Sequence, residues 1–152
     1  MGKAAPASDF AYGLSEDGQG VVIQKYRGKG GALVIPAEIE GLPVVKLYDT
    51  AFYAAGWYDP AYNITSVVIP ASVKLIGRSC FMGLEKLTSV TFLGTGVALG
   101  FQAFRGCTNL TELVFPDDEK ALIRGGSDTF YRCRKLPLAM RAKLRLMGFD
   151  EP

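Results

Sequence analysis

The segment Val90-Thr91-Phe92-Leu93, followed by Ala103-Phe104 and then Leu110, contains the pattern from which the fold is inferred. A run of β-branched and aromatic residues leads to a small residue with Phe, and then to Leu. The pattern occurs four times, and its Phe residues are separated by 29, 23 and 26 positions. Repeats of about 20–50 residues predict a solenoid, in which each unit buries its apolar face only against its neighbours. The other copies are Leu33-Val34-Ile35-Pro36 with Ala51-Phe52, Val67-Val68-Ile69-Pro70 with Cys80-Phe81 and Leu87, and Leu113-Val114-Phe115-Pro116 with Thr129-Phe130 and Leu136.

Each unit is expected to begin with a strand. Val90 and Phe92 would point inward and Thr91 outward, because successive side chains of a strand lie on opposite faces of the sheet. Proline follows three of the four strands and ends their pairing, since it has no N–H to donate. A short helical turn around each Phe then leads to the next strand, so that stacked coils place the four Phe rings in one ladder. Second extended segments are predicted at 44–47, 73–76 and 97–99.

Both ends of the repeat region have the signals of caps. Residues 10–31 alternate around Asp17-Gly18, which is a turn signal, and predict a β-hairpin. Residues 137–149 begin with proline, continue with good helix formers and reach Gly148, so they predict a helix that covers the last coil. The chain of 152 residues is therefore interpreted as one domain, with about four repeats over 32–136 between the two caps.

The composition excludes several classes of function. Hydrophobic residues make up 49%, charged residues 21% and the net charge is +2, which favours neither disorder nor nucleic-acid binding. Histidine is absent, so catalysis and metal binding that need histidine are excluded. The three widely spaced cysteines, Cys80, Cys107 and Cys133, are expected to be buried thiols rather than a disulfide framework or a zinc site. No apolar run is long enough to predict membrane insertion, no signal peptide is visible, and a signal already removed stays an open alternative.

The repeats resemble a known family. Leu-Thr-Ser-Val-Thr-Phe (87–92), Ile-Pro-Ala-Ser-Val-Lys-Leu-Ile-Gly (69–77) and Ala-Phe-Arg-Gly-Cys-Thr-Asn-Leu (103–110) are similar to the BspA-like, or treponemal-type, leucine-rich repeat. The resemblance implies a right-handed, β-rich solenoid with a parallel strand sheet, short helical turns and caps at both ends. It also implies a secreted or surface-exposed bacterial protein, since better-known members are adhesins that bind host matrix proteins or other cells. The family has no shared catalytic residues and no cofactor to carry over.

The first candidate for a binding surface is the outward side of the strand sheet. Its row contains Val68, Thr91 and Val114, with Glu112 alongside. Four strands of five residues make a face on the order of 320 Å², whereas a stable protein interface takes about 800 Å² per partner. The face is therefore expected to hold a peptide or glycan, or to form part of a larger patch. The alternative is that these residues occur there only because their side chains have a high propensity for β-strands.

The second candidate is an insertion of six residues within 53–63. It contains Trp57, which is the only tryptophan, together with Tyr58 and Tyr62. Insertions in repeat proteins often lie on binding faces, and aromatic residues are favoured anchors of interfaces. The three side chains are therefore interpreted as a recognition patch. The alternative is that the Trp57 ring packs over the first coil and closes it.

Two further clusters have simpler interpretations. The basic residues from Arg132 to Arg145 could meet an anionic partner, but a solvated helix face accounts for them as well. Asp117-Asp118-Glu119 is expected to be a solvated turn, because catalysis needs opposed carboxylates in a cleft. The leading hypothesis is a non-enzymatic module that recognises a protein or glycan, with host extracellular matrix among the candidates. The alternative is a structural scaffold of the bacterial envelope without a host ligand.

Overall fold

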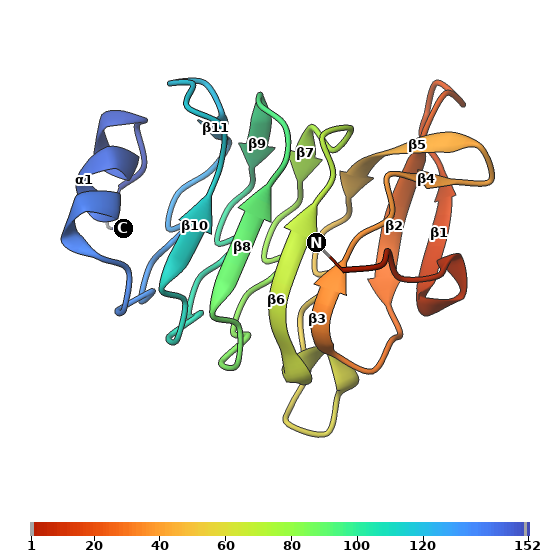
Figure 1. Cartoon of the computed structure of the whole chain (residues 1–152), viewed down its shortest axis with the longest axis horizontal. Coiled ribbons are helices and arrows are strands. Elements are labelled where there is room, and N and C mark those ends of the chain that lie inside the picture. The colour runs from red at the N-terminus through yellow and green to blue at the C-terminus, as the bar shows by residue number, and fades with distance from the viewer. Residues whose placement is uncertain (1, 151) are drawn as a thin grey trace.

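A computed structural model describes residues 2–150 and 152, and it shows a β-solenoid whose coils stack along the long axis (Figure 1). One side of the stack is a parallel sheet, here called the front sheet, whose strand order is β10-β8-β6-β3. The repeat pattern therefore predicted the solenoid and its four parallel strands correctly. The strands of the front sheet are β3 (Gly31–Val34), β6 (Ile64–Ile69), β8 (Ser89–Phe92) and β10 (Glu112–Val114).

The second extended segments of the coils form another sheet, the back sheet, with the order β1-β2-β5-β7-β9-β11. The predicted hairpin is present, and β2 pairs in parallel with β5, so the N-terminal cap continues the sheet. Two short strands were not predicted: β4, which pairs antiparallel with β5, and β11, which follows the acidic turn. The strands are β1 (Phe10–Leu14), β2 (Val21–Tyr26), β4 (Glu38–Ile39), β5 (Leu42–Leu47), β7 (Leu75–Ile76), β9 (Val97–Leu99) and β11 (Leu122–Arg124), and short 3₁₀ turns lie at η1 (Ala7–Asp9) and η2 (Pro60–Asn63).

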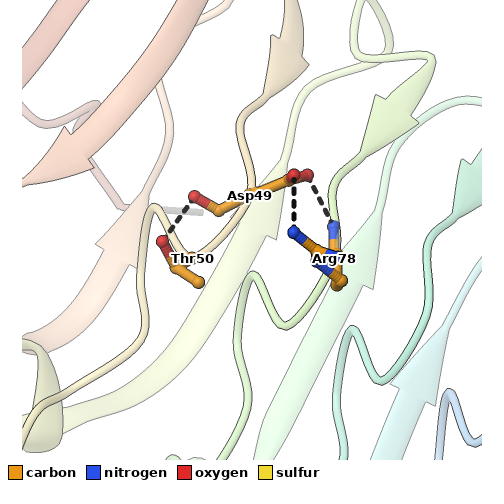
Figure 2. A network of polar contacts seen from close by, with 3 residues as sticks. All are labelled: Asp49, Thr50 and Arg78. Atoms are coloured by element: carbon orange, nitrogen blue, oxygen red, sulfur yellow. Dashed lines mark hydrogen bonds and ion pairs between the residues drawn. The ribbon is translucent and has the colours of Figure 1, made fainter.

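The third side of each coil consists of turns that are bonded from coil to coil. Two residues before each ladder Phe, a non-glycine residue adopts left-handed backbone angles; in the first coil it is Thr50, with φ of 58°. Its N–H donates to the carbonyl of Arg78 in the next coil at 2.9 Å. Figure 2 shows that the Asp49 carboxylate also accepts from the Arg78 backbone N–H at 2.9 Å, with the Arg78 guanidinium 3.9 Å away. A side chain at Gly77 would collide with this carboxylate, so the corner requires glycine there. The corresponding left-handed residues of the later coils are Ser79, Gln102 and Asp128.

The core contains the predicted ladder of Phe rings. Phe81 stacks on Phe52 with 4.7 Å between ring centroids, and Phe104 stacks on Phe81 at 5.0 Å and on Phe130 at 5.6 Å. All four rings are fully buried. The caps extend the stack, with Tyr26 on Phe52 at the hairpin end and the edge of another ring, Phe149, against Phe130 at the helix end. The stack is therefore closed by aromatic side chains at both ends.

The three cysteines are buried, as expected, and they lie beside this ladder. The Cys107 thiol donates to the Phe81 carbonyl at 3.1 Å, and the Cys133 thiol donates to the Phe104 carbonyl at the same distance. Burial raises the pKa of Cys133 to about 12, and it also raises the pKa values of Cys80 and Cys107 well above the ordinary range of a thiol. The thiols therefore stay protonated in the folded protein and act as small core residues.

The C-terminal cap is a helix, α1 (Leu138–Leu146), as the sequence predicts. Leu144 is fully buried against the last coil, and Gly148 has the positive φ that ends such a helix. Arg141 fixes the cap to the coil, because its guanidinium donates to the carbonyls of Leu136, Arg134, Cys133 and Pro152 at 2.8–3.1 Å. The cationic side chain thus ties the helix to the end of the last coil and to Pro152 through their carbonyl oxygens.

Candidate functional site

The aromatic insertion forms a loop between β5 and β6, and Asp59 organises it. The Asp59 carboxylate accepts from the N–H of Ala61 at 3.0 Å, which caps the 3₁₀ turn η2, and from the N–H of Ala55 at 3.4 Å. The backbone of Gly30, with φ of 87°, packs so closely against Pro60 and Asn63 that a side chain would collide with them. The base of the loop is therefore held to the first coil by its own turn and by its packing.

At the tip of this loop, Trp57 and Tyr58 are open to solvent. Trp57 is 78% exposed and Tyr58 is 71% exposed, and their rings meet edge to face with 6.2 Å between centroids. The alternative in which Trp57 packs over the first coil is wrong, because that packing would bury the ring. Figure 1 shows the loop below the start of β6, at the edge where the strands of the front sheet begin. Two large aromatic side chains are thus presented to solvent at this edge.

Tyr62 has a different environment from the two residues at the tip. Its hydroxyl donates to the Glu85 carboxylate of the next coil at 3.4 Å, and the Lys86 ammonium lies 5.3 Å from the centre of its ring. The ring is half-buried between these contacts. The structure therefore brings Trp57 and Tyr58 into contact, and it places Tyr62 on the same loop but against the neighbouring coil.

The predicted residues of the front sheet lie in register. Val68 pairs with Thr91, and Thr91 with Val114, so the three side chains form one outward row across β6, β8 and β10. Val114 is the most exposed of them, at 44%. Glu112 lies in the adjoining row, where its carboxylate accepts from the Ser89 hydroxyl at 3.2 Å. That row lies closer to the strand starts, so it connects the valine row with the edge that carries the aromatic loop.

A polar chain along the same edge was missed by the sequence reasoning. The Lys86 ammonium donates to the side-chain carbonyl of Asn63 at 2.8 Å, and the Lys135 ammonium donates to that of Asn109 at 2.7 Å. The Asn109 amide in turn donates to the Glu85 carbonyl at 2.6 Å. The signal was available, because Lys86, Asn109 and Lys135 each stand five residues after a ladder Phe. This edge is therefore rich in hydrogen-bonding groups that connect neighbouring coils.

The other candidates have structural roles in the described residues. Asp118 accepts from the Lys120 N–H and so stabilises its own turn, and residues 2–150 and 152 contain no group of three side chains that could hold a metal ion. An open hollow of about 540 Å³ beside the hairpin turn contains a Ser15 hydroxyl that donates to Asp17 at 2.7 Å. Hydrogen bonds from Ser15 and from the Gln19 N–H lower the pKa of Asp17, so this pair also stabilises a turn.

The two-sheet stack, the Phe ladder and the capped ends define the class of the protein, which is a leucine-rich-repeat solenoid. The chain belongs to the BspA-type leucine-rich-repeat family, since six copies of the "BspA type Leucine rich repeat region" match residues 48–140. No helix among residues 2–150 and 152 is long and apolar enough to cross a membrane.

Solved structures of bacterial proteins have the same fold. The T. pallidum leucine-rich-repeat protein TpLRR is 23% identical, with 97% of each chain covered and a TM-score of 0.56. A leucine-rich cell surface protein from Faecalibacterium prausnitzii is 24% identical, with a TM-score of 0.66 over 90% of this chain and 42% of the other. The chain thus spans less than half of that second protein. No curated protein matches the chain in sequence.

Proposed function

We propose that the chain is a non-enzymatic recognition module that binds a protein ligand through the aromatic loop and the adjoining front sheet. The observation that carries the proposal is the exposure of Trp57 and Tyr58 on a loop whose base is fixed by Asp59. Large aromatic side chains on a loop whose base is already ordered lose less entropy on binding than those on a mobile loop, which favours them as interface anchors.

The available area supports this combination of loop and sheet. The front sheet alone offers about 320 Å², and two aromatic side chains bury about 150–250 Å² each when a partner covers them. Together they approach the roughly 800 Å² per partner of a standard interface. Tyr62 and the polar edge at Lys86 lie between the two parts and would supply directional hydrogen bonds at the rim.

The proposal includes a location outside the bacterial cell and an adhesin-like role, with host extracellular matrix among the candidate ligands. Its support is membership of the BspA-type family and the name of the similar F. prausnitzii structure, which is a cell surface protein. No reaction is proposed, because the sequence lacks histidine and the Ser15–Asp17 pair stabilises a turn.

A binding screen against matrix proteins and a glycan array tests the proposal. A Trp57→Ala/Tyr58→Ala variant is expected to lose at least about tenfold in affinity for a matrix protein, since truncating an interface anchor costs more than about 1–2 kcal/mol. A Tyr48→Ala/Phe101→Ala variant is the matched control, because those aromatic side chains are 48% and 40% exposed outside the loop.

The front sheet is tested separately with Val68→Lys/Val114→Lys, which places charge on the valine row. Loss of binding in both the loop and the sheet variants would define one continuous surface. Equal binding by the loop variant and the wild-type chain would contradict the proposal. Binding to the glycan array alone would mean that the ligand is a carbohydrate and not a protein. The absence of binding by a folded sample would favour the envelope scaffold.

A further inference from the structure

The cap helix α1 has a second apolar face that nothing in the described chain covers. Its inner face packs on the last coil through Leu144. On the outer face, Leu138 is 83% exposed and Leu146 is 91% exposed, and exposed Ala142 lies between them. These residues are spaced by four, so they form one stripe along a helix about 13.5 Å long. Figure 1 shows α1 as the terminal layer of the stack, which leaves this stripe at the end of the molecule.

Charges of opposite sign flank the two ends of this stripe. Near its C-terminal end, Asp117, Asp118 and Glu119 line a hollow of about 420 Å³ together with Leu146 and Lys143. The Lys143 ammonium lies 4.7 Å from the centre of the Phe115 ring, and together with exposed Arg145 in the same turn it leaves one net negative charge at this end. Near the other end, exposed Arg134 and Lys135 lie in the turn before Pro137 and the start of the helix, with the Lys135 ammonium bonded to Asn109. One end of the stripe is therefore acidic and the other is basic.

We propose that two copies of the chain associate through this outer face of α1, with the helices antiparallel about a two-fold axis at Ala142. In that arrangement Leu138 of each copy meets Leu146 of the other, and small Ala142 side chains at the axis let the helices approach closely. The acidic loop 117–119 of each copy meets the basic residues Arg134 and Lys135 of the other. A two-fold interface must be complementary to itself, and opposite charges at the two ends of the stripe satisfy that requirement.

The interface is small, so the association is expected to be weak. A single short helix with its flanking loops buries less than the roughly 800 Å² per partner of a standard interface. We expect a dissociation constant on the order of 100 µM. The dimer should also weaken with added salt, because the flanking charges are exposed and therefore screened.

Sedimentation equilibrium over a wide range of concentrations tests the proposal. The wild-type chain is expected to show a monomer–dimer equilibrium, and Leu138→Gln/Leu146→Gln should raise the dissociation constant at least tenfold. The control Leu14→Gln/Leu93→Gln changes leucines that are 67% and 44% exposed elsewhere, and it should leave the equilibrium unchanged. Because the helix leucines are exposed, the variant should keep the thermal midpoint of the wild-type chain.

A charge exchange tests the antiparallel geometry. Arg134→Glu and Asp117→Arg should each weaken the dimer, and the chain that carries both changes should regain it, because the pair re-forms between copies. A wild-type chain that is monomeric at every concentration would overturn the proposal. Assemblies that grow beyond the dimer would also overturn it, since a two-fold interface closes after two copies. A doubly exchanged chain as weak as the single variants would overturn the antiparallel pairing.

Discussion

Replacing Phe104 by alanine tests the packing of the solenoid most directly, because this ring lies in the middle of the ladder. It is fully buried between Phe81 at 5.0 Å and Phe130 at 5.6 Å, and the edge of Phe92 is 6.2 Å away. The change leaves the backbone bond from the Phe104 N–H to the Thr129 carbonyl available, so it removes side-chain packing alone.

The loss of stability should be large. Truncation of a buried Phe to Ala costs about 3–5 kcal/mol through lost transfer free energy and the cavity that remains. Aromatic pairs contribute about 0.5–1.5 kcal/mol beyond the buried area, and Phe104 makes three such contacts. The expected loss therefore lies in the upper part of the range, at about 4–5 kcal/mol. For a chain of this length it corresponds to a fall of roughly 8–20 °C in the melting temperature.

Urea unfolding followed by circular dichroism measures this loss, with Phe101→Ala as the matched control. Phe101 lies three residues earlier and is 40% exposed, so its truncation should cost less than about 1.5 kcal/mol. If Phe104→Ala costs no more than the control, stacking in the Phe ladder does not stabilise the fold.

Two further predictions concern the thiols and the cap. Because burial raises the pKa values of Cys80, Cys107 and Cys133, the unfolded chain releases thiol protons above about pH 8.5 that the folded chain keeps. The free energy of unfolding should therefore be independent of thiol ionisation below that pH, and it should fall by about 1.4 kcal/mol per pH unit for each thiol as the pH rises toward 12. Urea midpoints between pH 8 and 10 measure this slope. A chain with all three cysteines changed to alanine should show a flatter slope. Arg141→Lys should destabilise the chain by about 1.5–3 kcal/mol through lost charged hydrogen bonds. Arg145 is exposed, so Arg145→Lys should cost less than about 0.5 kcal/mol. Equal urea midpoints for the two variants would contradict the role of Arg141 in holding the cap.

The repeat made most of the fold predictable. The segment after each Phe keeps its spacing, so the ladder and the front sheet could be placed from the sequence, and the outward row of Val68, Thr91 and Val114 followed from strand alternation. The elements that the sequence did not predict lie where the repeat pattern is interrupted. β11 follows a long acidic turn, and Tyr26 and Phe149 reach the ladder from caps that are not repeats.

The candidate site was less predictable than the fold. Its position followed from the insertion, but the exposure of Trp57 did not, because an insertion of this composition could equally have packed inward. The outcome depends on the Asp59 turn and on the close packing of Gly30 against the base of the loop. Tyr62 is half-buried because Glu85 and Lys86 of the next coil reach it, and the repeat did not predict this contact because Tyr62 belongs to the insertion.

The bonds between coils also determine how the molecule responds to force. On the turn side, the N–H of a left-handed corner such as Thr50 donates to the next coil, and the pattern repeats at Gln102, whose N–H donates to the Ser127 carbonyl. A pull on the C-terminal end therefore loads the bonds of the last coil before those of the others. A coil of 23 residues that opens releases roughly 80 Å of extended chain. The solenoid would thus lengthen by successive opening of its coils, and the aromatic loop at the first coil would keep its shape until the final steps.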